Sequence, residues 1–299
     1  MFEGIFPPIP TPFGADGALA LDRLEANLEK WNAVRPALSG YVVMGSNGEA
    51  PHLSVDEAVH LVGRTRRIAL PSMKVIAGTG QLSTWATIEV TKRAIDAGAD
   101  AALVVTPFYY KGRMTGDALQ RHYFAVAHAS SVPVLIYNVP ANTGFNIPAS
   151  VVAELAAHDN IAGIKDSAGD VNQLAELVRL AQGMKFEVLS GNFGAFLPSM
   201  SFGVKGAILA VANVAAGASM TMFEAARAGR WPEAGELHLR LLPVARAVTT
   251  QYGVPGLKAA LDLLGYFGGM PREPLLPLSD STRDDVATTL RRARLLSSP

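Results

Sequence analysis

Eight short apolar segments alternate along this chain with longer segments of helical character, and this alternation constrains its fold more than any other feature. The apolar segments cover residues 5–11, 40–44, 75–78, 101–106, 132–137, 161–164, 186–189 and 206–210. Near-continuous hydrophobicity is typical of parallel strands that are covered on both faces. Eight strand–helix units in about 225 residues fit a (β/α)8 barrel better than a doubly wound sheet, which usually has fewer strands. We therefore predict an α/β fold, a (β/α)8 TIM barrel.

Helix signals support this division of the chain. Ser54 and Glu57 form a capping-box pattern ahead of an apolar helical stretch, and Asp170 begins a weaker version of the same pattern. After Phe223 the strand signals stop, and residues 231–251, 256–265 and 283–296 have helical character. We expect residues 1–225 to form the catalytic barrel and residues 226–299 to form a C-terminal helical extension packed on it.

Charge and residue usage exclude several functions. The 299 residues include 26 basic and 26 acidic side chains, so no basic field attracts nucleic acid. The chain has no cysteine, and its six histidines show no metal-ligand spacing, which disfavours thiolate and metal catalysis. The uncharged stretch 206–223 contains Asn213 and Thr221, so we interpret it as a strand, a turn and a helix rather than a membrane span. No signal peptide is visible, and we expect a cytoplasmic protein.

One lysine is distinguished by its position at a strand end. Catalytic groups of such barrels lie at the C-terminal ends of the strands. Of the eight lysines, only Lys165 ends an otherwise apolar strand, 161–164. Burial favours the free amine of a lysine over the ammonium, and the free amine is the nucleophile that forms a Schiff base. The structural alternatives are a lysine that extends to solvent from the strand end and a lysine paired with Asp166.

Two further patterns lie at predicted strand ends. Tyr137 ends the strand before that of Lys165, so its phenol could transfer a proton between a carbonyl and an alcohol. The alternative is an aromatic lid whose hydroxyl binds water. The sequence Gly-Ser-Asn-Gly-Glu at 45–49 follows the second predicted strand, and its hydroxyl and backbone N–H groups could hold a carboxylate. Because glycine-rich loops are common, this second pattern is weak evidence by itself.

Three motifs together resemble those of the pyruvate-dependent class I aldolases, the superfamily of dihydrodipicolinate synthase and N-acetylneuraminate lyase. They are Gly-Ser-Asn-Gly-Glu at 45–49, Tyr-Asn-Val-Pro-Ala-Asn-Thr-Gly at 137–144 and Gly-Ile-Lys-Asp-Ser at 163–167. The resemblance extends from Pro10 to the C-terminal helices. It implies a (β/α)8 barrel with added helices, usually a homotetramer, that acts on pyruvate and an aldehyde through a covalent imine and without a cofactor.

The resemblance also implies roles for individual residues. Lys165 would form the imine with the keto carbon of pyruvate, and Tyr137 would be the proton shuttle. Ser46 and Asn47 would hold the pyruvate carboxylate, and Tyr109 would join the proton relay from a neighbouring subunit. Further candidates for substrate binding are Asn142, Ser167, Ile208 and Arg113.

Within the superfamily, residues 45–49, 105–114 and 252–258 look most like 4-hydroxy-2-oxoglutarate aldolase. Dihydrodipicolinate synthases usually carry an arginine where this chain has Asn142. The loss of that bidentate clamp weakens an assignment of this chain as a dihydrodipicolinate synthase. We therefore expect cleavage of 4-hydroxy-2-oxoglutarate to pyruvate and glyoxylate. The alternative is 4-hydroxy-tetrahydrodipicolinate synthase, which condenses pyruvate with aspartate semialdehyde. A non-catalytic barrel that binds a keto acid is a second alternative, which the presence of both Lys165 and Tyr137 argues against.

Overall fold

Eight parallel strands form a barrel in the computed structural model, which describes residues 2–297. The strand order is β1-β8-β7-β6-β5-β4-β3-β2. The strands are β1 Gly4–Phe6, β2 Gly40–Val43, β3 Lys74–Gly78, β4 Ala101–Val105, β5 Val134–Asn138, β6 Ile161–Asp166, β7 Glu187–Ser190 and β8 Gly206–Ile208. A parallel bridge between Pro8 and Val42 joins the two ends of the sheet, and the N–H of Ile9 donates to the Val42 carbonyl at 2.9 Å. The predicted (β/α)8 barrel is confirmed.

The first strand is shorter than predicted. The apolar segment 5–11 contributes only residues up to Phe6 to β1, and the chain continues as a loop with isolated bridges. Pro7, Pro8 and Pro10 explain the difference, because proline has no N–H group to donate to a ladder.

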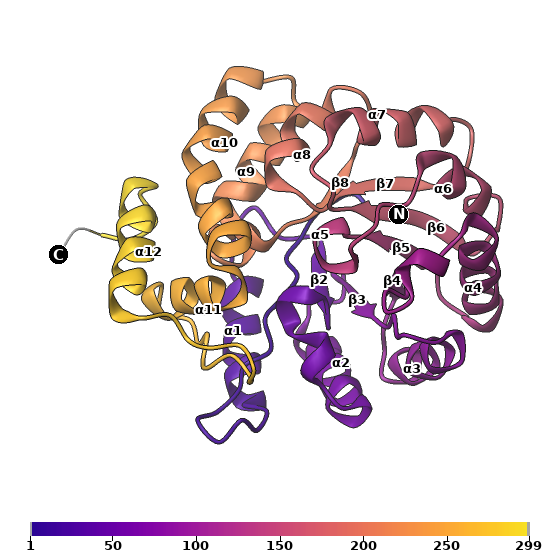
Figure 1. The fold of residues 1–299 in the computed structure, drawn as a ribbon. Helices are drawn as coiled ribbons and strands as arrows, with labels where there is room; N and C mark the ends of the chain where they lie inside the picture. Colours follow the sequence, from indigo (N-terminus) through magenta and orange to yellow (C-terminus); the bar gives the residue numbers. More distant parts are fainter. Residues whose placement is uncertain (1, 298–299) are drawn as a thin grey trace.

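Helices surround the strands as a ring (Figure 1). Those of the barrel are α1 Leu21–Asn32, α2 Val55–Ile68, α3 Thr84–Asp96, α4 Gly116–Ala129, α5 Pro140–Thr143, α6 Ala149–Leu155, α7 Val171–Leu180, α8 Phe193–Met200 and α9 Ala216–Arg227. Short 3₁₀ turns are η1 Ser46–Gly48, η2 Ala50–His52, η3 Lys111–Arg113 and η4 Ala210–Asn213. The capping box of α2 is confirmed, since Ser54 Oγ accepts from the Glu57 N–H at 3.2 Å and Glu57 accepts from the Ser54 N–H at 2.8 Å. Asp170 caps α7 as expected.

The C-terminal part consists of α10 Trp231–Arg246, the π-helical segment η5 Ala247–Gln251, α11 Gly253–Leu263 and α12 Asp280–Arg292. Helix α10 packs against α8 and α9, whereas α12 stands outside the ring, at the left of Figure 1. The predicted division at residue 225 falls inside α9 and stays a prediction. The stretch 206–223 forms β8, η4 and most of α9, and no helix among residues 2–297 is long and apolar enough to span a membrane.

Side-chain alternation along the strands produces two apolar layers. Val42, Leu103, Leu135 and Tyr137 belong to the cluster inside the barrel, whereas Ile136 belongs to the layer between strands and helices. Because the faces alternate residue by residue, the last residues of each strand determine which side chains face the mouth of the barrel. The active-site candidates lie at this end.

Candidate active site

Strands β5 and β6 place Tyr137 and Lys165 side by side. The two residues are direct register partners in the parallel ladder, so their side chains project to the same, inner face. Lys165 Nζ lies 4.0 Å from the centroid of the Tyr137 ring. Both side chains are buried, with 4% and 6% of their surface exposed. The structure therefore brings together an amine and a phenol at the carboxyl ends of neighbouring strands.

The Tyr137 phenol lies in a polar environment despite its burial. Burial alone would raise the pKa of this phenol, but the nearby Lys165 charge and hydrogen bonds with Ser46, Lys165 and Ser167 outweigh it, and the pKa is lowered. Ser46 Oγ lies 3.2 Å from the phenol oxygen. A phenol with a lowered pKa exchanges a proton more readily, which is the property that a proton shuttle needs.

The turn after β2, residues 45–49, is held by several backbone contacts. Its 3₁₀ segment η1 is closed by the Gly48 N–H, which donates to the Gly45 carbonyl at 3.0 Å. Thr11 Oγ1 donates to the Gly48 carbonyl at 2.6 Å, and Asn142 Nδ2 donates to Ser46 Oγ at 3.2 Å. The first N–H groups of a helical turn have no partner within that turn, so they are available to an anion.

A cavity of about 320 Å³ connects these groups. Its lining includes seven of the residues expected from the sequence, namely Ser46, Asn47, Tyr137, Asn142, Lys165, Ser167 and Ile208. The volume suits a small organic acid. Tyr109 and Arg113 do not line this cavity.

The sequence analysis missed the loop after β7, which supplies Gly191, Asn192 and Phe193 to the cavity. A Cβ atom at Gly191 would lie 1.9 Å from Ser167 Oγ and 2.9 Å from Lys165 Cε. Glycine at this position therefore leaves room for the lysine side chain. Its signal in the sequence, a glycine immediately after a buried strand, is too common to identify a functional residue.

The C-terminal helices also reach the cavity, which the sequence analysis did not foresee. Thr249 and Thr250 of η5, with Gly253 and Val254 at the start of α11, form part of its wall. Single π-helical turns are frequent at functional sites because the extra residue redirects side chains. This wall shows that the C-terminal helices complete the cavity rather than only cover the barrel.

Asp166 is not a partner of Lys165, which argues against that structural alternative. As the next residue along β6 it faces outward, where Asn138 Nδ2 and Gln173 Nε2 both donate to its Oδ2 at 2.7 Å. Burial raises the pKa of the Asp166 carboxyl, against the effect of these donors. The hydrogen bonds instead hold the ends of β5 and β6 together from the outer side.

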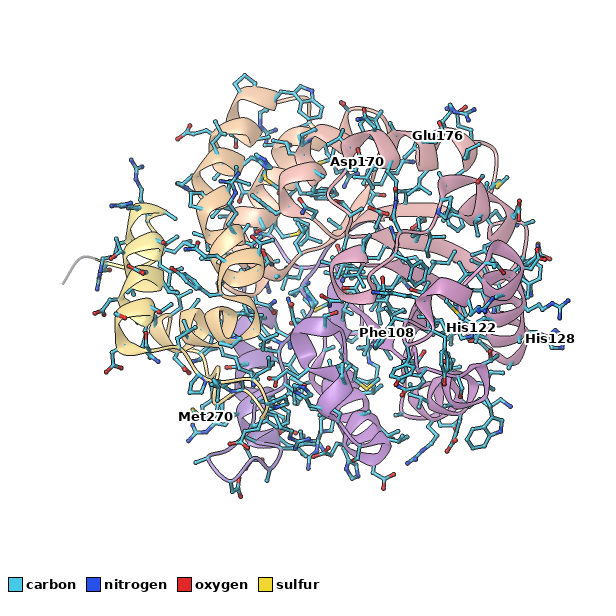
Figure 2. The ribbon with its side chains drawn as sticks, in the orientation of Figure 1. Phe108, His122, His128, Asp170, Glu176 and Met270 are labelled. Carbon is cyan, nitrogen blue, oxygen red and sulfur yellow. The ribbon has the colours of Figure 1, made fainter. Side chains whose placement is uncertain are left out.

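Tyr109 lies apart from the other expected residues. It belongs to the loop after β4 that also carries Phe108, labelled in Figure 2. Its side chain is 72% exposed and makes an edge-to-face contact with Tyr110, with ring centroids 5.0 Å apart. Within a single chain, Tyr109 therefore does not take part in the cavity.

A second cavity of about 560 Å³ opens at the amino-terminal ends of the strands, between residues such as Phe2, Lys185 and Gly206. It is larger, but its lining contains no tyrosine and no residue of the 45–49 turn, and its two lysines, Lys185 and Lys205, are exposed. Within residues 2–297 no group of three or more histidine, aspartate or glutamate side chains is placed to hold a metal ion. The smaller cavity is therefore the candidate active site.

The sequence matches the dihydrodipicolinate synthetase family over residues 1–293. The chain belongs to this family. The 4-hydroxy-tetrahydrodipicolinate synthase of Methanothrix thermoacetophila is 38% identical over 292 residues, which cover 98% of this chain and 97% of the relative. The enzyme of the same name from Methanoculleus marisnigri is 36% identical and covers 97% of this chain and 99% of its own. The dihydrodipicolinate synthase of Acinetobacter baumannii, solved in complex with pyruvate, superposes with a TM-score of 0.93 at 33% identity and covers 99% of this chain and 100% of that one.

Membership of the dihydrodipicolinate synthetase family establishes the class of reaction. The chain is an enzyme of the pyruvate-dependent class I aldolase type, which makes or breaks a carbon–carbon bond through a Schiff base between pyruvate and a lysine, without metal or organic cofactor. The non-catalytic alternative is thereby excluded.

The expected substrate must be corrected. The preference for 4-hydroxy-2-oxoglutarate cleavage is wrong, because full-length relatives at 36–38% identity are named 4-hydroxy-tetrahydrodipicolinate synthase. The motifs at 45–49, 137–144 and 163–167 belong to the imine chemistry that the whole superfamily shares. They contain little information about the second substrate, and neither the likeness of residues 105–114 and 252–258 to 4-hydroxy-2-oxoglutarate aldolase nor Asn142 is sufficient to assign it.

Proposed function

We propose that this protein is a 4-hydroxy-tetrahydrodipicolinate synthase, which condenses pyruvate with aspartate semialdehyde. The observation that carries the imine chemistry of the proposal is the register pair of Lys165 and Tyr137 in one cavity. The names of the full-length relatives support the choice of the second substrate. The cytoplasmic location expected from the sequence stays a prediction.

The reaction follows from the chemistry of the amine. Lys165 Nζ attacks the keto carbon of pyruvate, and loss of water gives an iminium ion. The iminium withdraws electrons from the methyl carbon, which loses a proton to form an enamine. The enamine carbon attacks the aldehyde carbon of aspartate semialdehyde, and Tyr137 protonates the new alkoxide. Attack on the iminium carbon by water or by the amine of the second substrate releases Lys165.

The remaining polar groups bind the two carboxylates. Ser46 and Asn47 hold the pyruvate carboxylate through the Ser46 hydroxyl and the backbone N–H groups of the turn. Asn142 and Ser167 face the same cavity and receive the second substrate. Since both are neutral, they bind a carboxylate less strongly than an arginine would.

Initial rates with purified protein test this function. The protein should consume pyruvate and aspartate semialdehyde faster than it releases glyoxylate from 4-hydroxy-2-oxoglutarate. Lys165→Ala should abolish condensation, and Tyr137→Phe should lower kcat by about 10²–10⁴-fold, the usual loss when a proton-transfer group is removed. Lys185→Ala, at the opposite end of the barrel, is the matched control and should retain full activity. Faster release of glyoxylate than condensation would overturn the assignment.

We further propose that the active form is a homotetramer, in which Tyr109 reaches the active site of a neighbouring subunit. The exposed aromatic pair of Tyr109 and Tyr110 supports this, because large aromatic side chains are typical of interface cores. A second copy would cover both rings and extend the proton relay that begins at Tyr137.

Mixed oligomers test whether Tyr109 acts between subunits. Tyr109→Phe and Lys165→Ala should each have low activity alone. After denaturation and refolding together, a mixed assembly contains sites that combine the intact Lys165 of one chain with the intact Tyr109 of the other, so activity should return. Light scattering gives the assembly size. A tetramer with no recovery of activity would contradict the role of Tyr109, and a monomer with full activity would contradict both statements.

A further inference from the structure

A buried ion pair links the 45–49 turn to the C-terminal helices. Glu49 Oε1 lies 2.6 Å from Lys258 Nζ, and the two side chains are 0% and 1% exposed. Lys258, on α11, also donates to the Met270 carbonyl at 2.8 Å and lies 4.6 Å from the centroid of the Phe13 ring. Figure 2 labels Met270 in the loop below α11. Neither charged residue lines the active-site cavity.

Stability alone does not account for this pair. Removing two charges from water costs several kcal/mol per ion, and apolar residues of similar volume often replace a buried pair without loss of stability. Burial lowers the pKa of the Lys258 ammonium, and the opposing effect of Glu49 does not fully compensate. An arrangement with this electrostatic cost suggests a requirement for a defined geometry.

Glu49 is the residue at which the turn ends. Its backbone is left-handed, with φ of 55°, and its N–H donates to the Ser46 carbonyl at 3.2 Å. Non-glycine residues hold this conformation only where surrounding contacts impose it. The carboxylate supplies such contacts, because its Oε2 also accepts from the backbone N–H of Arg272 at 2.8 Å. The side chain of Glu49 therefore fixes the backbone that carries Ser46.

The same pair connects two walls of the cavity. One wall is the 45–49 turn with Ser46 and Asn47, and the other is formed by Thr249 to Val254 at the junction of η5 and α11. Lys258 lies one turn further along α11 from Val254. A displacement of α11 would thus be transmitted to the turn through the ion pair, and the reverse also holds.

We propose that Glu49 and Lys258 are positioning residues that hold the 45–49 turn, and with it Ser46, in the geometry that binds the carboxylate of a 2-keto acid. The inference rests on the proposed function, because it takes this turn as the site of the pyruvate carboxylate. Neither residue touches the substrate. Both act through the backbone of the turn.

Trapping of the imine with borohydride measures binding of the keto acid. The trapped fraction is followed against the concentration of pyruvate or of pyruvamide, which lacks the carboxylate charge. The ratio of the two half-saturating concentrations gives the preference for pyruvate. In Lys258→Met, the half-saturating pyruvate concentration should rise about tenfold, whereas trapping at saturation should change less than about threefold. The preference for pyruvate over pyruvamide should fall by about the same factor of ten. A merely structural weakening would affect both ligands equally.

The double variant Glu49→Gln/Lys258→Met distinguishes an effect on the geometry of the 45–49 turn from an effect on the stability of the fold. It removes both buried charges, so thermal stability should return toward that of the wild type even if Lys258→Met alone fails to fold. The loss of preference for pyruvate should remain. Arg283→Met is the matched control, since it removes the exposed contact of Arg283 with Asp262 of α11, 4.0 Å away, and should leave the preference unchanged.

The outcomes distinguish the inference from the function on which it rests. Absence of trapping in the wild type would overturn the proposed function and this inference with it. Trapping in the wild type, together with an unchanged preference for pyruvate in the double variant, would overturn this inference alone.

Discussion

At the scale of single residues, strand alternation explains most of the site. Lys165 and Tyr137 face inward and Asp166 and Asn138 face outward because consecutive residues of a strand point to opposite faces. Lys165 and Tyr137 could be proposed from the sequence because each ends an apolar strand, and the roles expected for them came from the resemblance of the motifs that contain them. Gly191 was not predictable, because its importance comes from the Lys165 and Ser167 side chains that approach it in space.

Asn142 is the residue at which this chain departs most clearly from the expected pattern. It lines the cavity and carries no charge. In Asn142→Arg, a guanidinium could form a bidentate, charge-assisted contact with the carboxylate of aspartate semialdehyde, worth about 1.5–3 kcal/mol. We expect the KM for aspartate semialdehyde to fall about tenfold or more, and the KM for pyruvate to stay within a factor of about two.

Steady-state kinetics with each substrate varied in turn measures this effect. Asn142→Lys is the matched control, since it adds a charge without the planar fork and should give a smaller gain. An unchanged KM for aspartate semialdehyde in Asn142→Arg would show that the second carboxylate binds elsewhere.

At the scale of elements, the loop between α11 and α12 forms hydrogen bonds with the N-terminus of α2. The Arg272 guanidinium donates to both carboxylate oxygens of Glu57, at 2.6 and 2.9 Å, while Glu57 completes the capping box with Ser54. Hydrogen bonds from Arg272 outweigh desolvation and lower the pKa of Glu57 from 4.5 to about 2. The ionised carboxylate therefore stabilises the folded state.

The sign of the pH dependence follows from this lowered pKa. Because the folded pKa lies below the unfolded value, the contribution of Glu57 is fully present above pH 4.5 and is lost as the pH falls toward 2. We expect the difference in free energy of unfolding between wild type and Glu57→Gln to be constant near neutral pH and to shrink below pH 4.5. Glutamine retains the capping box, so the comparison isolates the charge.

Urea unfolding at several pH values between 7 and 3 provides the measurement, with the pH range set by the two pKa values of Glu57. Asp56→Asn removes a neighbouring carboxylate whose pair with Arg93 is exposed, and should change stability by less than about 1 kcal/mol. A difference for Glu57→Gln that is the same at pH 3 and pH 7 would contradict the linkage to this carboxylate.

Elements with strong local signals were predictable, and those defined by distant contacts were not. The capping box of α2, the N-cap of α7 at Asp170 and the division of 206–223 into a strand, a turn and a helix depend on neighbouring residues, and the structure confirms them. The π-helical segment η5 could not be predicted, because its role depends on the barrel mouth against which it packs. Lys258 had the pattern of an ordinary helical lysine, since its partner Glu49 lies far away in the sequence.

At the scale of the whole molecule, the eight apolar segments were sufficient to predict the barrel. Eight strands buried on both faces, in a chain of this length, leave few other folds. The sequence also indicated the imine chemistry, through the resemblance of the motifs that contain Lys165 and Tyr137 to those of the pyruvate-dependent class I aldolases. It did not indicate the second substrate, which depends on how cavity walls from several segments meet. The relatives named 4-hydroxy-tetrahydrodipicolinate synthase supplied that information.

The central claim is that Lys165 forms the covalent intermediate with pyruvate. Reduction with borohydride in the presence of labelled pyruvate, followed by peptide mapping, tests it most directly. We predict one label per chain, located on Lys165 in the peptide that contains β6, and no label in Lys165→Ala. A label on any other lysine, or condensation of the two substrates without any trapped adduct, would contradict the account.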